Sequence, residues 1–236
     1  MRLSTLNASG VPARIKIFLN GYNIRDRAQV SLSNPVIDTE AIITRYYPAG
    51  SVTRSLLLRH GELVGRKAIE ILDRFPWIDA DREFVVQAAV LHDIGIGRTR
   101  CPELGCTGTM PYVCHGVEGR AILDKLGLFR HGLVCERHVG VGISADQAVR
   151  RKLPLPARDM IPLSVEERLI CYADKFFSKT DDGRHEKTID EIIAGLTRYE
   201  AEYANRFLTL HRWFNQNPFN TSGSAGTLSM HGKTKP

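Results

Sequence analysis

The stretch from Ala88 to Gly95 constrains this chain most, because its apolar run passes directly into a histidine and an aspartate. Val85, Ala88 and His92 are spaced as neighbours on one helical face, which predicts that His92 lies on a buried stripe. Asp93 follows at the expected helix end, just before Gly95, a residue suited to a left-handed stop. A buried imidazole beside a buried carboxylate is costly unless a partner such as a divalent metal ion satisfies both. For an isolated pair, a core histidine and a capping aspartate would be the simpler interpretation.

Ionisable residues also take the place of hydrophobic ones on the apolar stripes of other predicted helices. Together with His92 and Asp93 they form a set of imidazoles and carboxylates that suits a pair of borderline metals better than Ca²⁺ or Mg²⁺. Several helices that direct such side chains inward are typical of a metal site in a helical core. The predicted metal ligands are His60, His92, Asp93, His115, His138 and Asp174.

The hydrophobic periodicity predicts an all-α fold, a helical bundle with a metal site in its core and no convincing sheet. Glycines and prolines divide the helices, and they leave a loop at 95–114 and an irregular connection at 143–162. The expected helices begin with 38–46, capped by Asp38, and 52–74, followed by a helix from Asp79 or Asp81 to His92 and Asp93. The next helices run from His115 to Gly127 and, over a short stretch, up to His138. A capping box at Ser164 to Glu167 begins the Asp174 helix, and the last helix, 187–214, has Ile189, Ile192, Ile193, Leu196 and Tyr199 on its inner face.

The chain divides into an N-terminal extension (1–36), one domain (37–215) and a C-terminal tail (216–236) that we expect to be disordered. The two tails carry the whole formal charge of +6, which leaves the domain neutral. A neutral domain lacks the basic balance of a dedicated nucleic-acid protein, so nucleic acid is not an expected partner. Association with a second copy of the chain is left open.

The five cysteines, an odd number, suggest a reducing compartment. No apolar run approaches the length of a membrane span, and the expected location is the cytoplasm. Cys101, Cys106 and Cys114 lie in or beside the 95–114 loop, but no second pair with zinc spacing accompanies them. Cys135 and Cys171 lie in apolar helical contexts and are interpreted as small core residues.

The order of the predicted metal ligands along the sequence resembles that of the HD superfamily of metal-dependent phosphohydrolases. The segment His92-Asp93-Ile94-Gly95 resembles the HDIG form of its motif. The two additional histidines, His115 and His138, resemble the branch that has six ligands and two metals. The resemblance covers roughly residues 38–215. No Gly-Tyr-Pro motif follows His138, which counts against an enzyme for cyclic dinucleotides.

This resemblance implies a metal-dependent phosphohydrolase or phosphodiesterase, acting on a nucleotide or another small phosphate ester. Asp93 would bridge two divalent transition metals, with Fe or Mn favoured and Zn, Co or Ni as alternatives. A hydroxide between the metals would attack phosphorus. Arg137 and Lys175 are the candidates for contacting phosphate, and no separate organic cofactor is expected. Weaker candidates are Arg98, Arg100 and Lys179.

The metal assignment implied by the resemblance gives His60, His92 and Asp174 to one ion and His115 and His138 to the other. The same ligands also serve a second class of chemistry, that of a diiron oxygenase of the same fold. A third possibility is a module that senses nucleotides without turning them over. Ligand identity cannot separate these three hypotheses, because all of them require the same donor atoms.

Overall fold

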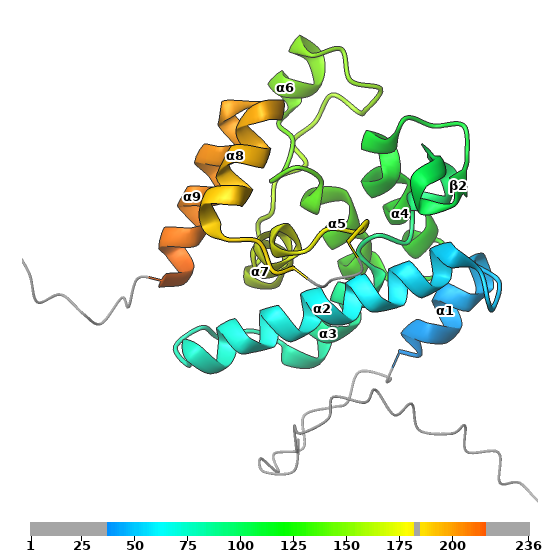
Figure 1. The fold of residues 1–236 in the computed structure, drawn as a ribbon, viewed down its shortest axis with the longest axis horizontal. Helices are drawn as coiled ribbons and strands as arrows, with labels where there is room; N and C mark the ends of the chain where they lie inside the picture. Colours follow the sequence, from blue (N-terminus) through cyan, green and yellow to red (C-terminus); the bar gives the residue numbers. More distant parts are fainter. Residues whose placement is uncertain (1–36, 182–184, 216–236) are drawn as a thin grey trace, which may run out of the picture.

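The computed structural model describes residues 37–181 and 185–215, and these residues are mostly helical, as predicted (Figure 1). One small hairpin interrupts the helices. The elements are α1 (Thr39–Tyr46), α2 (Val52–Arg74), α3 (Arg82–Leu91), β1 (Arg100–Cys101), β2 (Cys106–Thr107), α4 (His115–Asp124), α5 (Phe129–His138), α6 (Ala145–Arg150), α7 (Val165–Ala173), α8 (Ile189–Tyr199) and α9 (Ala201–Asn215), with short 3-10 turns η1 (Ile96–Arg98), η2 (Pro102–Leu104), η3 (Tyr112–Cys114) and η4 (Asp174–Phe176).

Polar caps begin the first three helices where the sequence places them. The side chains of Asp38, Ser51 and Asp81 each accept a hydrogen bond from a backbone N–H three residues on, which satisfies one of the free donors at a helix start. Ser164 begins α7 in the same way. The predicted capping box is only half formed there, because the Glu167 carboxylate accepts from the N–H of Leu163 instead.

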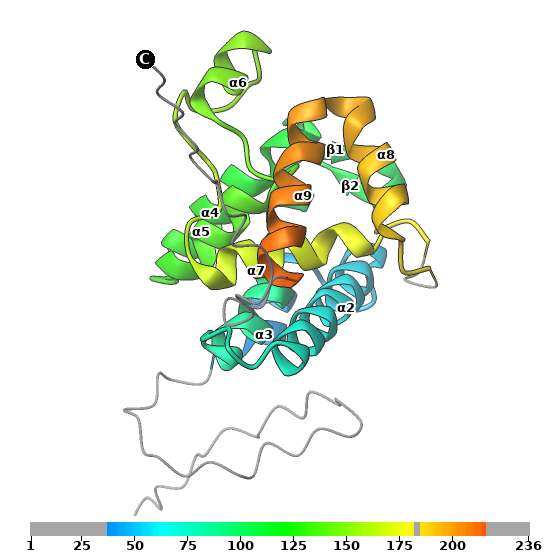
Figure 2. The same cartoon turned by 90° about the vertical axis from the view of Figure 1, so that its left-hand side faces the viewer.

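Helix α7 lies at the centre of the bundle, in contact with α2, α3 and α5, while α2 packs along α3 and α4 along α5 (Figures 1 and 2). Helices α8 and α9 pair and close one side over α7. The fully buried Val64, Ala88 and Ile170 come from three of these helices and belong to one hydrophobic cluster. The polar cluster described below therefore lies inside packed apolar walls.

Three segments, two connections and one helix, differ from the predictions. The 95–114 loop contains an antiparallel hairpin in which Cys101 pairs with Cys106, and the 143–162 connection contains α6, started by a capping box at Ser144. The predicted helix 187–214 is broken at Glu200, whose backbone is extended. This break turns Tyr199, predicted to be internal, outward with 75% of its surface exposed.

Gly95 does not provide the predicted left-handed stop, since its φ is −82°. The structure needs glycine there for a different reason, namely the close approach of α4. A Cβ at Gly95 would lie 2.0 Å from the carbonyl oxygen of His115 and 2.3 Å from the N–H nitrogen of Gly119. The glycine thus brings the segment after Asp93 against the start of α4, where His115 lies.

The predicted extension (1–36) and C-terminal tail (216–236) lie outside the described residues. The predicted domain boundaries therefore stay predictions. None of the helices in the described part of the chain is both long and apolar enough to cross a membrane.

Candidate functional site

Each of the predicted ligands lies at a position that its helix directs toward the centre of the bundle. His60 is in the middle of α2, while His92 follows the last residue of α3. His115 opens α4, and His138 is the last residue of α5. Asp174 directly follows α7, at the start of the 3-10 turn η4. Side chains from five separate parts of the chain therefore converge on Asp93.

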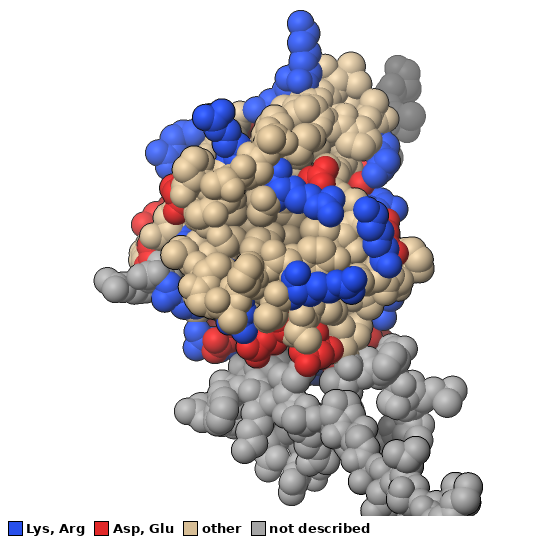
Figure 3. All heavy atoms as spheres, turned by 90° about the vertical axis from the view of Figure 1, so that its right-hand side faces the viewer, with Lys and Arg blue, Asp and Glu red and all other residues tan. Residues whose placement is uncertain are grey.

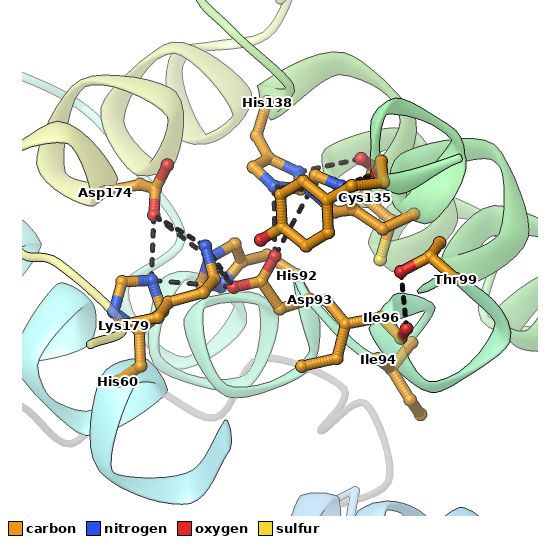
Figure 4. Close-up of polar contacts among 12 residues, drawn as sticks. His60, His92, Asp93, Ile94, Ile96, Thr99, Cys135, His138, Asp174 and Lys179 are labelled. Atoms are coloured by element: carbon orange, nitrogen blue, oxygen red, sulfur yellow. Dashed lines mark hydrogen bonds and ion pairs between the residues drawn. The ribbon is translucent and has the colours of Figure 1, made fainter. Parts of the chain in front are cut away.

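The convergent side chains form two groups that share Asp93, and within each group the ligand atoms lie within 4.8 Å of one another. The first group is His60, His92, Asp93 and Asp174, and the second is Asp93, His115 and His138. All of these residues are buried. We call the six residues the His/Asp cluster, and Figure 4 labels all of them except His115.

Each oxygen of Asp93 faces a different group. Oδ2 lies 3.1 Å from Nε2 of His92 and 3.5 Å from Nε2 of His60. Oδ1 lies 3.4 Å from Nε2 of His115 and 3.3 Å from Nε2 of His138. This arrangement places one carboxylate between two sets of imidazole nitrogens.

Backbone carbonyls orient three of the imidazoles. Nδ1 of His92 lies 2.6 Å from the carbonyl oxygen of Ala89, and Nδ1 of His115 and of His138 lie 2.7 and 2.8 Å from the carbonyls three residues before them. A carbonyl only accepts, so each Nδ1 carries a proton, and each ring, in its neutral form, presents the lone pair of Nε2 to the cluster. The Nε2 atoms of His115 and His138 are 3.1 Å apart, a repulsive arrangement that a shared cation or proton relieves.

Several polar atoms of the cluster lack a hydrogen-bond partner of acceptable geometry. They include both oxygens of Asp93, Nε2 of His92 and Nδ1 of His60, all fully buried. Most buried polar groups in proteins are hydrogen-bonded, so such a concentration in one place is typical of a ligand-binding site. The donor set, imidazole nitrogens with carboxylate oxygens, fits a metal ion.

Burial and charge shift the pKa values of the cluster in opposite directions. Burial lowers the pKa of His60 to about 4 and that of His115 to about 3. Burial would also lower the pKa of His92, but the carboxylates of Asp93 and Asp174 outweigh it and raise the value to about 9. Burial opposes ionisation of Asp93, yet the neighbouring cations hold its pKa well below the usual value. The carboxylate therefore stays ionised.

Two lysines lie against the carboxylates of the cluster. Nζ of Lys175 lies 2.6 Å from Oδ2 of Asp174 and 3.1 Å from the carbonyl oxygen of His138. Nζ of Lys179 lies 2.8 Å from Oδ2 of Asp93 and 3.9 Å from Oδ1 of Asp174. Lys175, a predicted phosphate contact, thus touches the cluster directly, and so does Lys179, which the sequence indicated only weakly.

The predicted phosphate contact Arg137 lies elsewhere. Its Nη1 donates to both carboxylate oxygens of Glu167, at 3.0 and 2.9 Å. Arg98 pairs with Glu118 at 2.9 Å. Of the arginines named from the sequence, Arg100 lines the cleft described next.

A cleft of about 820 Å³ lies beside the cluster, and Asp174, Lys175 and Lys179 form part of its wall. Its cationic side chains outnumber its acidic ones, and two tyrosines add aromatic surface. The cations are Arg100, Lys175, Lys179, Lys187 and Arg198, the acids are Glu103, Asp174 and Glu191, and the tyrosines are Tyr112 and Tyr199. Lys and Arg side chains also lie across the face shown in Figure 3.

The chain matches two archaeal RNA-modifying enzymes in part. It is 34% identical over 124 residues to the tRNA (cytidine(56)-2'-O)-methyltransferase of Picrophilus torridus, covering 52% of this chain and 32% of that protein. It is 29% identical over 159 residues to the enzyme of the same name from Thermoplasma volcanium, covering 66% of this chain and 41% of that protein. An uncharacterized protein of Methanocaldococcus jannaschii is 34% identical over 116 residues, covering 49% of this chain and 59% of that protein.

The chain thus spans between about a third and three fifths of the length of these relatives. No family model and no solved structure matches it.

These matches contradict the predicted membership of the HD superfamily and the predicted phosphohydrolase, because the relatives that carry a functional name are RNA methyltransferases. The oxygenase and the nucleotide-sensing alternatives gain no support either. The physical reason is that a pattern of buried histidines and aspartates specifies donor atoms, whereas it does not specify which bond those atoms help to make or break.

The cofactor and partner predictions are corrected by the same finding. The methyltransferase names of the relatives do not imply a pair of Fe or Mn ions as cofactor. The same names include tRNA, which contradicts the prediction that nucleic acid is not a partner. The neutral net charge of residues 37–215 is no argument against a nucleic-acid partner, because it averages over the surface. Local excess of cations, as in the cleft, decides whether a polyanion binds.

Proposed function

We propose that this chain is a metal-binding helical protein that binds tRNA and works in its 2'-O-methylation. The metal would lie in the His/Asp cluster, and the RNA backbone would lie in the cleft beside it. A role on tRNA agrees with the cytoplasmic location expected from the sequence. The observation that carries the proposal is the convergence of buried imidazole Nε2 atoms on the Asp93 carboxylate, beside a cationic cleft.

The metal part of the proposal rests on the cost of the cluster without an ion. Three imidazoles are held by backbone carbonyls with their Nε2 atoms directed inward, and the carboxylate between them is 1% exposed. Such outer hydrogen bonds fix the ring orientation and tautomer of metal-binding histidines. Bound metal would supply positive charge at the base of the cleft, where an RNA phosphate could meet it.

The RNA part rests on the cleft and on the names of the relatives. Lys187 and Arg198, on the α8 side of the cleft, supply cations that could neutralise phosphates. Tyr199, also in the wall and 75% exposed, offers a ring on which a base could stack. Two of the relatives are named for action on tRNA.

A second candidate is that this chain itself transfers the methyl group. The relatives' names favour it, and the ribose 2'-hydroxyl must lose its proton during such a transfer, for which buried imidazoles are suitable acceptors. More than half of each named methyltransferase lies outside the matched segment, however. We therefore prefer the binding role as the first proposal for this chain.

The test is the binding of an unmodified tRNA transcript, measured by fluorescence anisotropy at several salt concentrations. The double variant Lys187→Glu with Arg198→Glu should bind at least tenfold more weakly and with a salt dependence smaller by about two phosphate contacts. The matched control is Arg66→Glu with Lys125→Glu, two exposed cations that do not line the cleft. Equal losses in both double variants would contradict the cleft and leave only a net-charge effect.

A methylation assay on the same transcript separates the two candidates. The chain is incubated with tRNA and S-adenosylmethionine labelled in its methyl group, and label in the RNA is counted. Transfer by the isolated chain would make the second candidate correct. Tight tRNA binding without transfer supports the first.

A further inference from the structure

Lys179 is the feature of the His/Asp cluster that a simple metal site does not explain. Its side chain is 15% exposed, and its ammonium contacts the first ligand group at Oδ2 of Asp93, 2.8 Å away, and at Oδ1 of Asp174, 3.9 Å away. Figure 4 shows its side chain beside His60, directed toward the two carboxylates. A cation already stands next to the oxygens that a metal would use.

The two carboxylates differ in how the chain neutralises them. Asp174 has Lys175, whose ammonium is 2.6 Å from its Oδ2. Within the described residues, the ammonium in contact with Asp93 is that of Lys179, and the other close cationic or basic groups are imidazoles. A buried carboxylate without a cation is strongly unfavourable. Lys179 therefore supports the packed cluster as long as no metal is bound.

A metal in the first group and the Lys179 ammonium cannot both lie against the same oxygens at low cost. Both are positive, and like charges a few ångströms apart in a buried site repel strongly. The cleft offers space for the Lys179 side chain to move into, because Lys179 and its neighbours Ser178 and Thr180 line it. A shift of this flexible side chain would carry its charge from the cluster into the cleft.

We propose that Lys179 is an exchangeable counter-cation, which neutralises Asp93 in the metal-free protein and withdraws into the cleft when a metal binds. This proposal rests on the metal site of the proposed function and adds a regulatory link to it. The released ammonium adds a positive charge to the surface that would meet an RNA phosphate. Metal and anion would then bind with positive coupling, each strengthening the other.

The first experiment measures metal affinity by competition with a chromogenic chelator, using Zn²⁺ and Mn²⁺ as probes. Lys179→Gln removes the competing charge and should bind metal at least tenfold more tightly than wild type. Lys179→Arg keeps a charge and should stay within a few-fold of wild type. Lys125→Gln, an exposed lysine outside the cleft, is the control for loss of one charge and should match wild type.

The second experiment uses the wild-type chain, so it does not depend on the folding of a variant. Lysines are acylated briefly with an N-hydroxysuccinimide ester, with and without saturating metal, and each site is quantified by mass spectrometry. Modification of Lys179 should rise at least fivefold with metal, because the amine moves from the carboxylates into the cleft. Modification of Lys125 should not change.

The outcomes separate the two proposals. Metal bound equally by wild type and by Lys179→Gln, or no change in Lys179 acylation with metal bound, would overturn the counter-cation and leave the metal site standing. Failure of wild type and Lys179→Gln alike to bind metal would overturn both. Metal bound by Lys179→Gln and not by wild type would support the counter-cation in its strongest form.

Discussion

Gly95 and His115 are in such close backbone contact that a single methyl group would not fit between them. The Cβ of any other residue at position 95 would lie 2.0 Å from the His115 carbonyl oxygen. This contact joins the segment that carries Asp93 to the helix that carries His115, the two being members of one ligand group. The shape of the site therefore depends on a glycine that makes no polar contribution to it.

Gly95→Ala should lower the free energy of unfolding by about 3 kcal/mol, the upper range for overpacking, because backbone atoms rather than a flexible side chain must move. Gly195→Ala is the matched control, since a Cβ there meets nothing within 4 Å and the residue lies in α8. The control should be neutral or more stable by roughly 0.5 kcal/mol. Urea denaturation followed by circular dichroism measures both, and equal stability of Gly95→Ala and wild type would contradict the packing argument.

Arg137→Met should cost roughly 2 kcal/mol of stability, because it leaves the 7% exposed carboxylate of Glu167 without its charged partner. The same change should leave tRNA binding within twofold of wild type, since the guanidinium is directed at Glu167 and does not line the cleft. Both quantities are measured on the same preparation. A selective loss of tRNA binding at unchanged stability would restore the phosphate-contacting role predicted from the sequence.

His131 should make the protein less stable in mild acid. Burial and the neighbouring Arg130 lower its pKa from 6.5 to about 4, so the folded state prefers the neutral ring. Above pH 6.5 the ring is neutral in both states and costs nothing. As pH falls from 6.5 to 4 the unfolded state takes up the proton first, and stability falls by up to about 3 kcal/mol, at 1.36 kcal/mol per pKa unit.

The His131 prediction is checked by comparing wild type with His131→Gln, which can keep a polar contact to Gln87 and does not titrate. Their difference in unfolding free energy should be constant above pH 6.5 and should change in favour of the variant between pH 6.5 and 4. Parallel pH curves would show that His131 does not titrate differently in the folded state.

The helices and their inward polar residues could be predicted because both depend on local spacing. His60 and His138 interrupt apolar stripes, and Asp38, Ser51 and Asp81 are caps that act within one turn. The break between α8 and α9 could not be predicted from local spacing, because the apolar spacing continues past Glu200. The Glu200 carboxylate accepts hydrogen bonds from Gln147 and Arg150 of α6. Tertiary contacts decided that boundary.

The cleft as a whole escaped prediction for a similar reason, although three of its cations, Arg100, Lys175 and Lys179, were named from the sequence as candidates for contacting phosphate. Arg100, Lys179 and Arg198 lie far apart in the sequence and share a wall only because the hairpin, the segment after α7, and α8 come together. The chemistry was predicted wrongly because the ligand pattern fixes the donors of a site and leaves its reaction open. The contact of Lys179 with Asp93, 86 positions away in the sequence, could not be predicted, because no sequence periodicity links the two residues.

Metal should stabilise the wild-type chain, since an ion that binds the folded cluster and not the unfolded chain shifts the equilibrium by mass action. At a hundredfold excess over the dissociation constant the gain is about 2.7 kcal/mol, and chelator should remove it. Asp93→Asn should abolish the gain, because Asp93 belongs to both ligand groups. Asp146→Asn, whose side chain is 82% exposed on α6, should keep it. The measurement is thermal unfolding with Zn²⁺, Mn²⁺ and Mg²⁺ in turn, and a wild-type chain that none of them stabilises would show that the cluster is held together by its internal charges alone.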